Sequence, residues 1–204
     1  AAKVLEYLGR NSVAEEYRER AAKVRDAVNR WCVDENGVYI DGPGVKQYSQ
    51  HCQVFALLAG CVDPQKGAEN LKKSMEDPET YAQCSVAMAY YLYRALEKAG
   101  MYAETEKCWD LWKKMVKDNL TTCVEDGVNG RSDCHAWGSL ILFELPAVVL
   151  GVHPAAPGYE KIAVEPNPGY LEWAKGEVIT KKGMVKVSWK KTESGVDVAY
   201  ELPQ

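Results

Sequence analysis

The sequence is poor in the features that mark several classes of protein. It has no run of Lys or Arg, no Cys-x-x-Cys pair and no apolar stretch long enough to cross a bilayer. Without a basic stripe, nucleic acid is a poor candidate partner, and without an apolar span so is a membrane. The formal net charge of −4 also disfavours, weakly, an anionic polysaccharide.

The seven cysteines are odd in number and lack the spacing of a zinc site. Cys52, Cys84 and Cys108 fall in helical apolar patterns, where a thiol behaves as a small hydrophobic group. Cys134 and His135 could indicate a metal site or a thiol nucleophile near Cys123, but further ligands do not follow at a useful spacing. We therefore expect no metal, no cofactor, and a reducing, cytoplasmic setting.

The chain has neither a signal peptide nor an initiating Met, and Ala1 already falls inside a predicted helix. We therefore expect it to be a piece of a longer protein. Hydrophobic residues make up 47% of the chain and charged residues 26%, a balance that permits a buried core.

Residues 1–150 show helical apolar periodicity. Ser12-x-x-Glu15 predicts a capping box and then a long helix. Its expected buried stripe is Ala14, Tyr17, Ala21, Val24, Val28 and Trp31. A second helix is expected to end at Gly60, and Asp63-Pro64 to open a third.

Capping residues and apolar periodicity predict the later helices as well. Thr80-x-x-Gln83 predicts a second capping box, at the start of a helix that ends near Gly100. A further helix is expected to turn Cys108, Leu111, Trp112 and Met115 inward. Residues 136–150 are apolar on almost every side, which predicts a buried helix with a kink at Pro146.

From residue 155 onward, Pro and Gly cluster and the apolar period becomes two, which predicts strands near 160–165, 171–180, 183–190 and 196–201. The expected fold class is mainly α with a β tail, divided into a helical domain (1–153) and a partial β-sandwich domain (154–204). Such strands leave exposed edges, so they need further strands or the helical domain for stability. Consecutive helical hairpins could form a solenoid or a closed α/α barrel, and the absence of a strict repeat weakens the solenoid.

The loop at 121–138 holds the densest set of chemical groups: carboxylates, the guanidinium of Arg131, the imidazole of His135 and the indole of Trp137. That inventory suits a sugar, because carboxylates supply acid–base chemistry and an aromatic face covers C–H groups. By composition alone such a loop is more often a solvated turn than a site, and Trp137 is as typical of core packing as of ligand contact.

Several motifs in the chain resemble bacterial α-L-rhamnosidases of glycoside hydrolase family 78. The specific part is Thr121-Thr122-x-x-Glu125, Arg131-Ser132-Asp133-Cys134-His135-Ala136-Trp137 and Val149-Leu150-Gly151-Val152-x-Pro154-Ala155-Ala156-Pro157-Gly158-Tyr159. Weaker matches are Tyr48-Ser49-Gln50-His51 upstream, and Ile162-x-Val164-x-Pro166 and Val185-x-Val187-x-Trp189 in the tail.

The resemblance implies the C-terminal half of an (α/α)6 six-hairpin barrel, followed by part of an antiparallel β-sandwich-like domain. It implies an inverting hydrolase that releases terminal α-L-rhamnose from a rhamnosyl glycoside or oligosaccharide. By the same resemblance, Glu125 is the general base, His135 bonds a sugar hydroxyl and Trp137 forms an apolar wall. The family's general acid lies upstream of this segment, so we expect the chain alone to be inactive.

Two other functions stay open at this stage. One is a different six-hairpin glycosidase or lyase, because a shared fold does not fix the substrate. The other is a non-catalytic carbohydrate-binding or scaffold module. A half-barrel would also expose a large apolar face, which predicts self-association.

Overall fold

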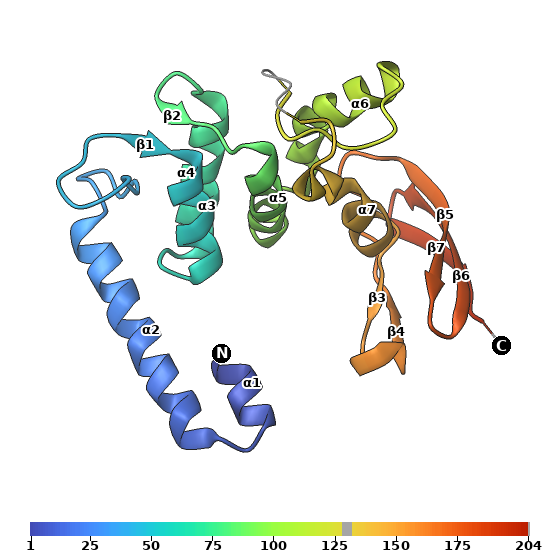
Figure 1. Cartoon of the computed structure of the whole chain (residues 1–204), viewed down its shortest axis with the longest axis horizontal. Coiled ribbons are helices and arrows are strands. Elements are labelled where there is room, and N and C mark those ends of the chain that lie inside the picture. The colour runs from blue at the N-terminus through green and yellow to red at the C-terminus, as the bar shows by residue number, and fades with distance from the viewer. Residues whose placement is uncertain (128–131, 204) are drawn as a thin grey trace. The chain divides into compact units, whose positions relative to one another are not determined.

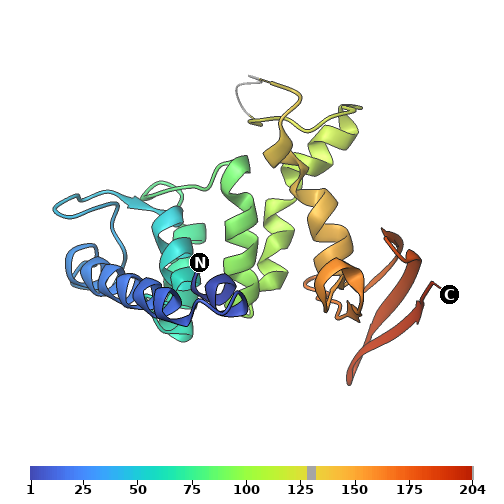
Figure 2. The same ribbon diagram turned by 60° about the horizontal axis from the view of Figure 1, so that its bottom comes forward.

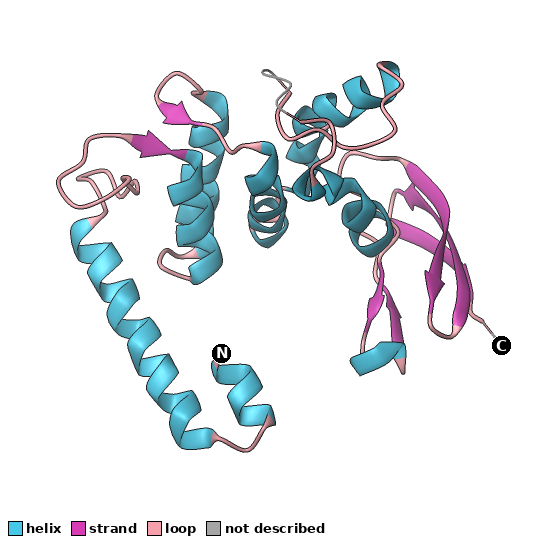
Figure 3. Ribbon diagram, in the orientation of Figure 1, coloured by secondary structure: helices cyan, strands magenta, loops and turns pink. Residues whose placement is uncertain are grey.

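In the computed structural model, which describes residues 1–127 and 132–203, the chain is mainly helical with a small antiparallel sheet near its C-terminus (Figure 1). The strands of that sheet stand out in Figure 3. The chain forms two compact units, residues 1–84 and 85–204. The boundary expected at 153/154 separates a helical domain from a β-domain and does not concern these contact-based units, so it stays a prediction. None of the described helices combines the length and apolarity needed to cross a membrane.

The first unit contains four helices and two short strands. These are α1 (Ala2–Tyr7), α2 (Asn11–Trp31), β1 (Tyr48–Ser49), α3 (Gln50–Ala59), α4 (Pro64–Glu76) and β2 (Tyr81–Ala82). Helices α3 and α4 lie side by side (Figures 1 and 2), with Leu57 and Leu71 fully buried. The ends of these helices are as expected: Gly60 caps α3 in a left-handed conformation, and the Asp63 side chain accepts from the Lys66 N–H before Pro64.

Two expectations for α2 are wrong. The helix begins at Asn11, and no side chain caps its N-terminus, so the capping box at Ser12 does not form. Of the predicted stripe only Ala14 is buried, whereas Val24 is 62% exposed and Trp31 60% exposed. The physical reason is that α1 is the element that packs most closely on α2, and it is too short to cover the stripe.

The second expected capping box is also wrong. Thr80 precedes strand β2, which pairs in parallel with β1, and Gln83 donates to the carbonyl oxygens of Ser74 and Tyr81. These backbone groups compete for the Gln83 amide that would have capped a helix.

The second unit begins with helical elements. They are η1 (Val86–Met88), α5 (Ala89–Lys98), η2 (Tyr102–Cys108), α6 (Asp110–Lys117), η3 (Ala136–Leu140), α7 (Ile141–Phe143) and η4 (Glu144–Val149). As expected, α6 buries Trp112 and Met115, and Gly100 follows α5.

The stretch 136–150 is less regular and less buried than expected. It passes from a 3-10 turn (η3) through α7 into a π-helical turn (η4) that contains Pro146. Proline lacks the N–H of a regular helix, which accounts for the wider turn where a kink was expected. Leu142 is 73% exposed, so the helix is not buried all round.

The strands of the second unit form two small antiparallel sheets. One pairs β3 (Val152–Pro154) with β4 (Ile162–Val164). The other has the order β5–β6–β7, with bounds Trp173–Thr180, Gly183–Thr192 and Gly195–Glu201. Alternate residues of β6, Val185, Val187 and Trp189, are buried in one core with residues of η4 and β3, which confirms the predicted period of two. Strand β3 was not predicted.

Candidate functional site

The candidate site loop folds back on itself, so that two separated stretches of sequence are joined by backbone hydrogen bonds. The Glu125 N–H donates to the Ser132 carbonyl oxygen at 2.9 Å, and the His135 N–H donates to the Cys123 carbonyl oxygen at 2.8 Å. The Thr122 hydroxyl donates to the carbonyl oxygen of Asp133 between them. These bonds place residues 123–125 beside residues 132–135.

The three predicted site residues come together. Nε2 of His135 lies 3.9 Å from Oε1 of Glu125, within ion-pair range and beyond hydrogen-bond length. The ring centroids of His135 and Trp137 lie 4.3 Å apart, with 42° between the ring planes. Carboxylate, imidazole and indole therefore follow one another along one side of the loop.

Their exposure suits contact with a ligand. The Glu125 side chain is 16% exposed and the His135 side chain 27%, so both are sheltered and still reachable. Trp137 is 45% exposed, although it begins a helical segment, so its indole is not a core group. Arg131, another member of the predicted loop inventory, lies outside the described residues.

His135 has one ring nitrogen without a partner. Its Nδ1 is buried and makes no hydrogen bond with any described residue. A neutral imidazole carries one donor and one acceptor nitrogen, and Nε2 faces the Glu125 carboxylate. Nε2 is therefore the ring nitrogen that lies beside the carboxylate, whereas Nδ1 is closed to solvent.

Sequence reasoning missed the residues that support this loop. Gly138 is buried against the backbone of Cys123 and Val124, and its carbonyl oxygen accepts from the Trp112 indole N–H at 2.8 Å. A glycine inside an apolar run was the available signal, because such a glycine often marks a close backbone approach.

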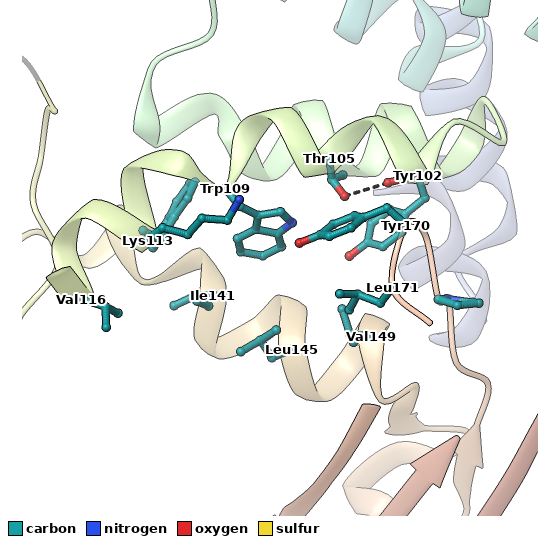
Figure 4. Close-up of a pocket in the computed structure, with 12 residues that line it drawn as sticks. Tyr102, Thr105, Trp109, Lys113, Val116, Ile141, Leu145, Val149, Tyr170 and Leu171 are labelled. Carbon is teal, nitrogen blue, oxygen red and sulfur yellow. Dashed lines mark hydrogen bonds between the residues drawn. The ribbon is translucent and has the colours of Figure 1, made fainter. Parts of the chain in front are cut away.

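A separate cavity of about 260 Å³ lies between η2–α6 and α7–η4 (Figure 4). In the close-up, Trp109 and Tyr102 project from one side, and Ile141, Leu145 and Val149 face them from the other. Its lining contains no carboxylate and no imidazole, so it lacks the acid–base groups of the Glu125 loop.

A buried charged group lies elsewhere in the second unit. Glu144 is fully buried, and its Oε1 accepts from the Tyr102 hydroxyl at 2.7 Å and from Arg94 Nη2 at 2.5 Å. Burial raises the pKa of Glu144, against the lowering effect of the Tyr102 hydrogen bond and the Arg94 charge. Within residues 1–127 and 132–203, no three His, Cys, Asp or Glu side chains gather in a way that could hold a metal.

Comparisons with known proteins agree on one relationship. Residues 151–204 match the family model of the bacterial α-L-rhamnosidase C-terminal domain. An α-L-rhamnosidase of Alteromonas sp. (strain LOR) is 28% identical over 223 residues, which cover 96% of this chain and 23% of that protein.

Two solved structures are similar in fold. The family 78 rhamnosidase of Bacillus sp. GL1 superposes with a TM-score of 0.81 at 26% identity, covering 98% of this chain and 23% of that one. The Streptomyces avermitilis α-L-rhamnosidase, solved in complex with L-rhamnose, gives a TM-score of 0.74 at 19% identity, covering 99% and 21%.

The fold, the loop and these matches define a segment homologous to glycoside hydrolases. More narrowly, the chain resembles a segment of the bacterial α-L-rhamnosidases of glycoside hydrolase family 78. It spans less than a quarter of the length of these relatives.

Proposed function

We propose that this chain supplies the general-base side of an inverting α-L-rhamnosidase, which releases terminal α-L-rhamnose from a glycoside or oligosaccharide. The observation that carries the proposal is the gathering of Glu125, His135 and Trp137 on one loop, within a chain homologous to such hydrolases.

Inversion requires two carboxyl groups on opposite faces of the sugar. They stand about 6.5–9.5 Å apart, which leaves room for the attacking water beside the base. In the proposed reaction, the Glu125 carboxylate takes a proton from that water as its oxygen attacks the anomeric carbon. In the same step the glycosidic bond breaks on the opposite face of the sugar, as a general acid protonates the leaving oxygen.

The neighbouring groups bind and orient the sugar in this proposal. His135 bonds a hydroxyl group through Nε2, the ring nitrogen that lies beside the Glu125 carboxylate. Trp137 presents an exposed indole face to the C–H side of the ring. The neutral, hydroxyl-rich ligand requires no cofactor for this step.

The general acid of the pair lies outside this segment in our proposal, within the other half of a six-hairpin α/α barrel whose C-terminal half is formed here. General acid assistance is worth about 10²–10⁴-fold, and the missing half would also supply walls of the pocket. We therefore expect no measurable hydrolysis of an aryl α-L-rhamnoside by the 204-residue chain itself.

The decisive experiment uses a longer enzyme that contains this segment. Glu125→Gln should lower kcat on an aryl α-L-rhamnoside by about 10²–10⁴-fold, because the amide cannot accept the proton of the water. Asp126→Asn is the matched control, since it neutralises the adjacent carboxylate, and we expect little loss there.

The competing functions give different results. If Glu125→Gln turns over substrate as fast as Asp126→Asn, the loop has no base and the segment acts as a non-catalytic module. If the unaltered enzyme hydrolyses another glycoside far better, and only Glu125→Gln loses that activity, the substrate assignment is wrong although the chemistry stands.

A further inference from the structure

The backbone just before Glu125 makes an unusually close contact with Gly138 of η3. A Cβ atom added at Gly138 would lie 2.6 Å from the carbonyl oxygen of Val124 and 2.9 Å from Cβ of Cys123. Packed side chains do not approach a backbone oxygen so closely, so only glycine allows this fit. The first turn of η3 therefore fixes the position of the backbone at residues 123 and 124, which lead into Glu125.

Gly138 is itself anchored by an indole from helix α6. The Trp112 Nε1–H donates to the Gly138 carbonyl oxygen at 2.8 Å, and the Trp112 side chain is buried. The bond is made away from water, so its loss would remove a buried hydrogen bond from the Gly138 carbonyl oxygen. Helix α6 and the loop are thereby joined at the base of the site.

The Trp112 ring cannot turn freely, because other rings hold it. The ring centroid of Trp109 lies 5.7 Å away and that of Tyr93 6.4 Å away, both in edge-to-face geometry. Tyr93 and Trp109 also meet each other at 5.3 Å. This aromatic cluster of Tyr93, Trp109 and Trp112 gives the Gly138 anchor a rigid base.

Helix α6 touches the loop at a second point. The side chain of Leu111 lies against Gly127, where an added Cβ would stand 2.7 Å from Cδ1 of the leucine. Consecutive residues of α6 thus contact the loop on both sides of Glu125 in sequence, at positions 127 and 138.

We propose that Trp112, acting through Gly138, is a positioning residue that sets the place of the Glu125 carboxylate relative to the His135 imidazole. The inference rests on the proposed function and deepens it. It follows from the order of contacts: the indole holds Gly138, Gly138 holds Cys123 and Val124, and these lead directly to Glu125. His135 is tied to the same stretch through the Cys123 carbonyl oxygen.

The test compares Trp112→Phe with Trp109→Phe in a longer enzyme that contains this segment. Both variants shrink a buried indole of the same cluster, but only the first removes the N–H that holds Gly138. A displacement of about 1 Å can cost about 10²-fold in rate, so Trp112→Phe should lower kcat by about 10–10²-fold with little change in KM. Trp109→Phe loosens the packing around Trp112 but keeps the Trp112 N–H, so it should lower kcat much less.

Two further readouts separate positioning from loss of structure. The pH dependence of kcat should shift in Trp112→Phe and not in Trp109→Phe, because only the first moves the base relative to the imidazole. In a double-mutant cycle, Trp112→Phe should cost little more once Glu125 is already Gln, since the two act through one group.

The outcomes separate failure of the proposed function from failure of the positioning role of Trp112. If Glu125→Gln leaves turnover intact, the proposed function itself fails. The positioning role is overturned if Glu125→Gln abolishes turnover but Trp112→Phe behaves like Trp109→Phe. It is also overturned if the losses of Trp112→Phe and Glu125→Gln are additive. Should Trp112→Phe not fold, hydrogen exchange in the unaltered chain decides: a protected Trp112 indole N–H supports the anchor, and rapid exchange of that N–H overturns it.

Discussion

At the scale of single residues, the second unit depends on one charged side chain that water does not reach. Glu144 is fully buried and keeps Oε2 without a hydrogen-bond partner, while Oε1 is shared by Tyr102 and Arg94. The guanidinium of Arg94 also pairs with Glu97, at 2.6 Å, on its more exposed side. An ion pair of this kind adds little net stability, yet breaking it by removing one partner is costly.

We predict that Arg94→Met destabilises the chain by about 3–5 kcal/mol near neutral pH, because it leaves the Glu144 charge buried and unpaired. Glu97→Gln is the matched control: it removes the other partner of the same guanidinium, and its cost should stay below about 1 kcal/mol since Glu97 is half-exposed. Urea unfolding of both variants measures the two losses. Equal losses would contradict a special role for the buried carboxylate.

The same pair predicts a pH dependence with a definite sign. Burial raises the pKa of Glu144 above its ordinary value of 4.5, so the contribution of this group to stability is fully present below that value. It is lost as the pH rises through the raised pKa, where the buried carboxyl must give up its proton. The penalty of Arg94→Met should therefore shrink toward acidic pH, and a penalty that grows there would reverse the assignment.

The sequence indicates the roles of some single residues and not of others. Glu125, His135 and Trp137 were predicted to form a site because they stand in a recognisable motif; the structure brings them together, and their roles stay a prediction. Arg94 and Glu144 are 50 positions apart, and no local pattern joins them. Such a pair becomes visible only when packing has set which polar groups are buried together.

At the scale of elements, the junction between η4 and β3 rests on one glycine. Gly151 has a φ of +75°, and a Cβ atom there would lie 2.2 Å from the carbonyl carbon of Glu165. Its carbonyl oxygen accepts the Glu165 N–H at 2.9 Å, so the close approach extends the pairing of β3 with β4.

We predict that Gly151→Ala destabilises the chain much more than Gly158→Ala. Both glycines have φ near +70°, so both variants incur the left-handed backbone cost of about 1–2 kcal/mol. Only Gly151 has a neighbour in the way, since nothing lies within 4 Å of a Cβ at Gly158. The steric overlap should add about 1–3 kcal/mol, measured as a lower urea midpoint. Similar midpoints for the two variants would show that the backbone at Glu165 can move aside.

Elements with a strong local signal could be predicted, and those decided by tertiary contacts could not. Asp63-Pro64 and Gly60 marked helix ends correctly, because capping acts within one turn. The sequence at Thr80 resembled a cap, but Gln83 bonds to Ser74 and Tyr81 instead. The wide turn at Pro146 likewise depends on what surrounds the proline.

At the scale of the whole molecule, each unit exposes large apolar side chains that a finished core would cover. In the first unit Val24 and Trp31 are 62% and 60% exposed, and in the second Val116 and Leu142 are 75% and 73% exposed. The stripe expected on α2 is apolar, but among the described residues only Ala14 of it is buried. Sequence periodicity shows which face is apolar, and it cannot show what lies against that face.

We predict that the 204-residue chain self-associates through these helical surfaces. Sedimentation velocity should show a mass that rises with protein concentration, together with binding of a hydrophobic dye. Val116→Lys combined with Leu142→Lys should weaken the association. Ile179→Lys is the control, because Ile179 is 80% exposed but lies on strand β5. A monomer at every concentration, without dye binding, would contradict the half-barrel interpretation.

The indole anchor at Gly138 also has a kinetic consequence. It joins residues 26 positions apart, and the similar bond from Trp189 Nε1 to the Val149 carbonyl oxygen spans 40. Contacts between distant positions form only after the intervening chain has lost much of its freedom, so they arise later than the turns of individual helices. A nascent chain that already carries Glu125 is therefore expected to fix the position of that carboxylate only after η3 has been made and docked.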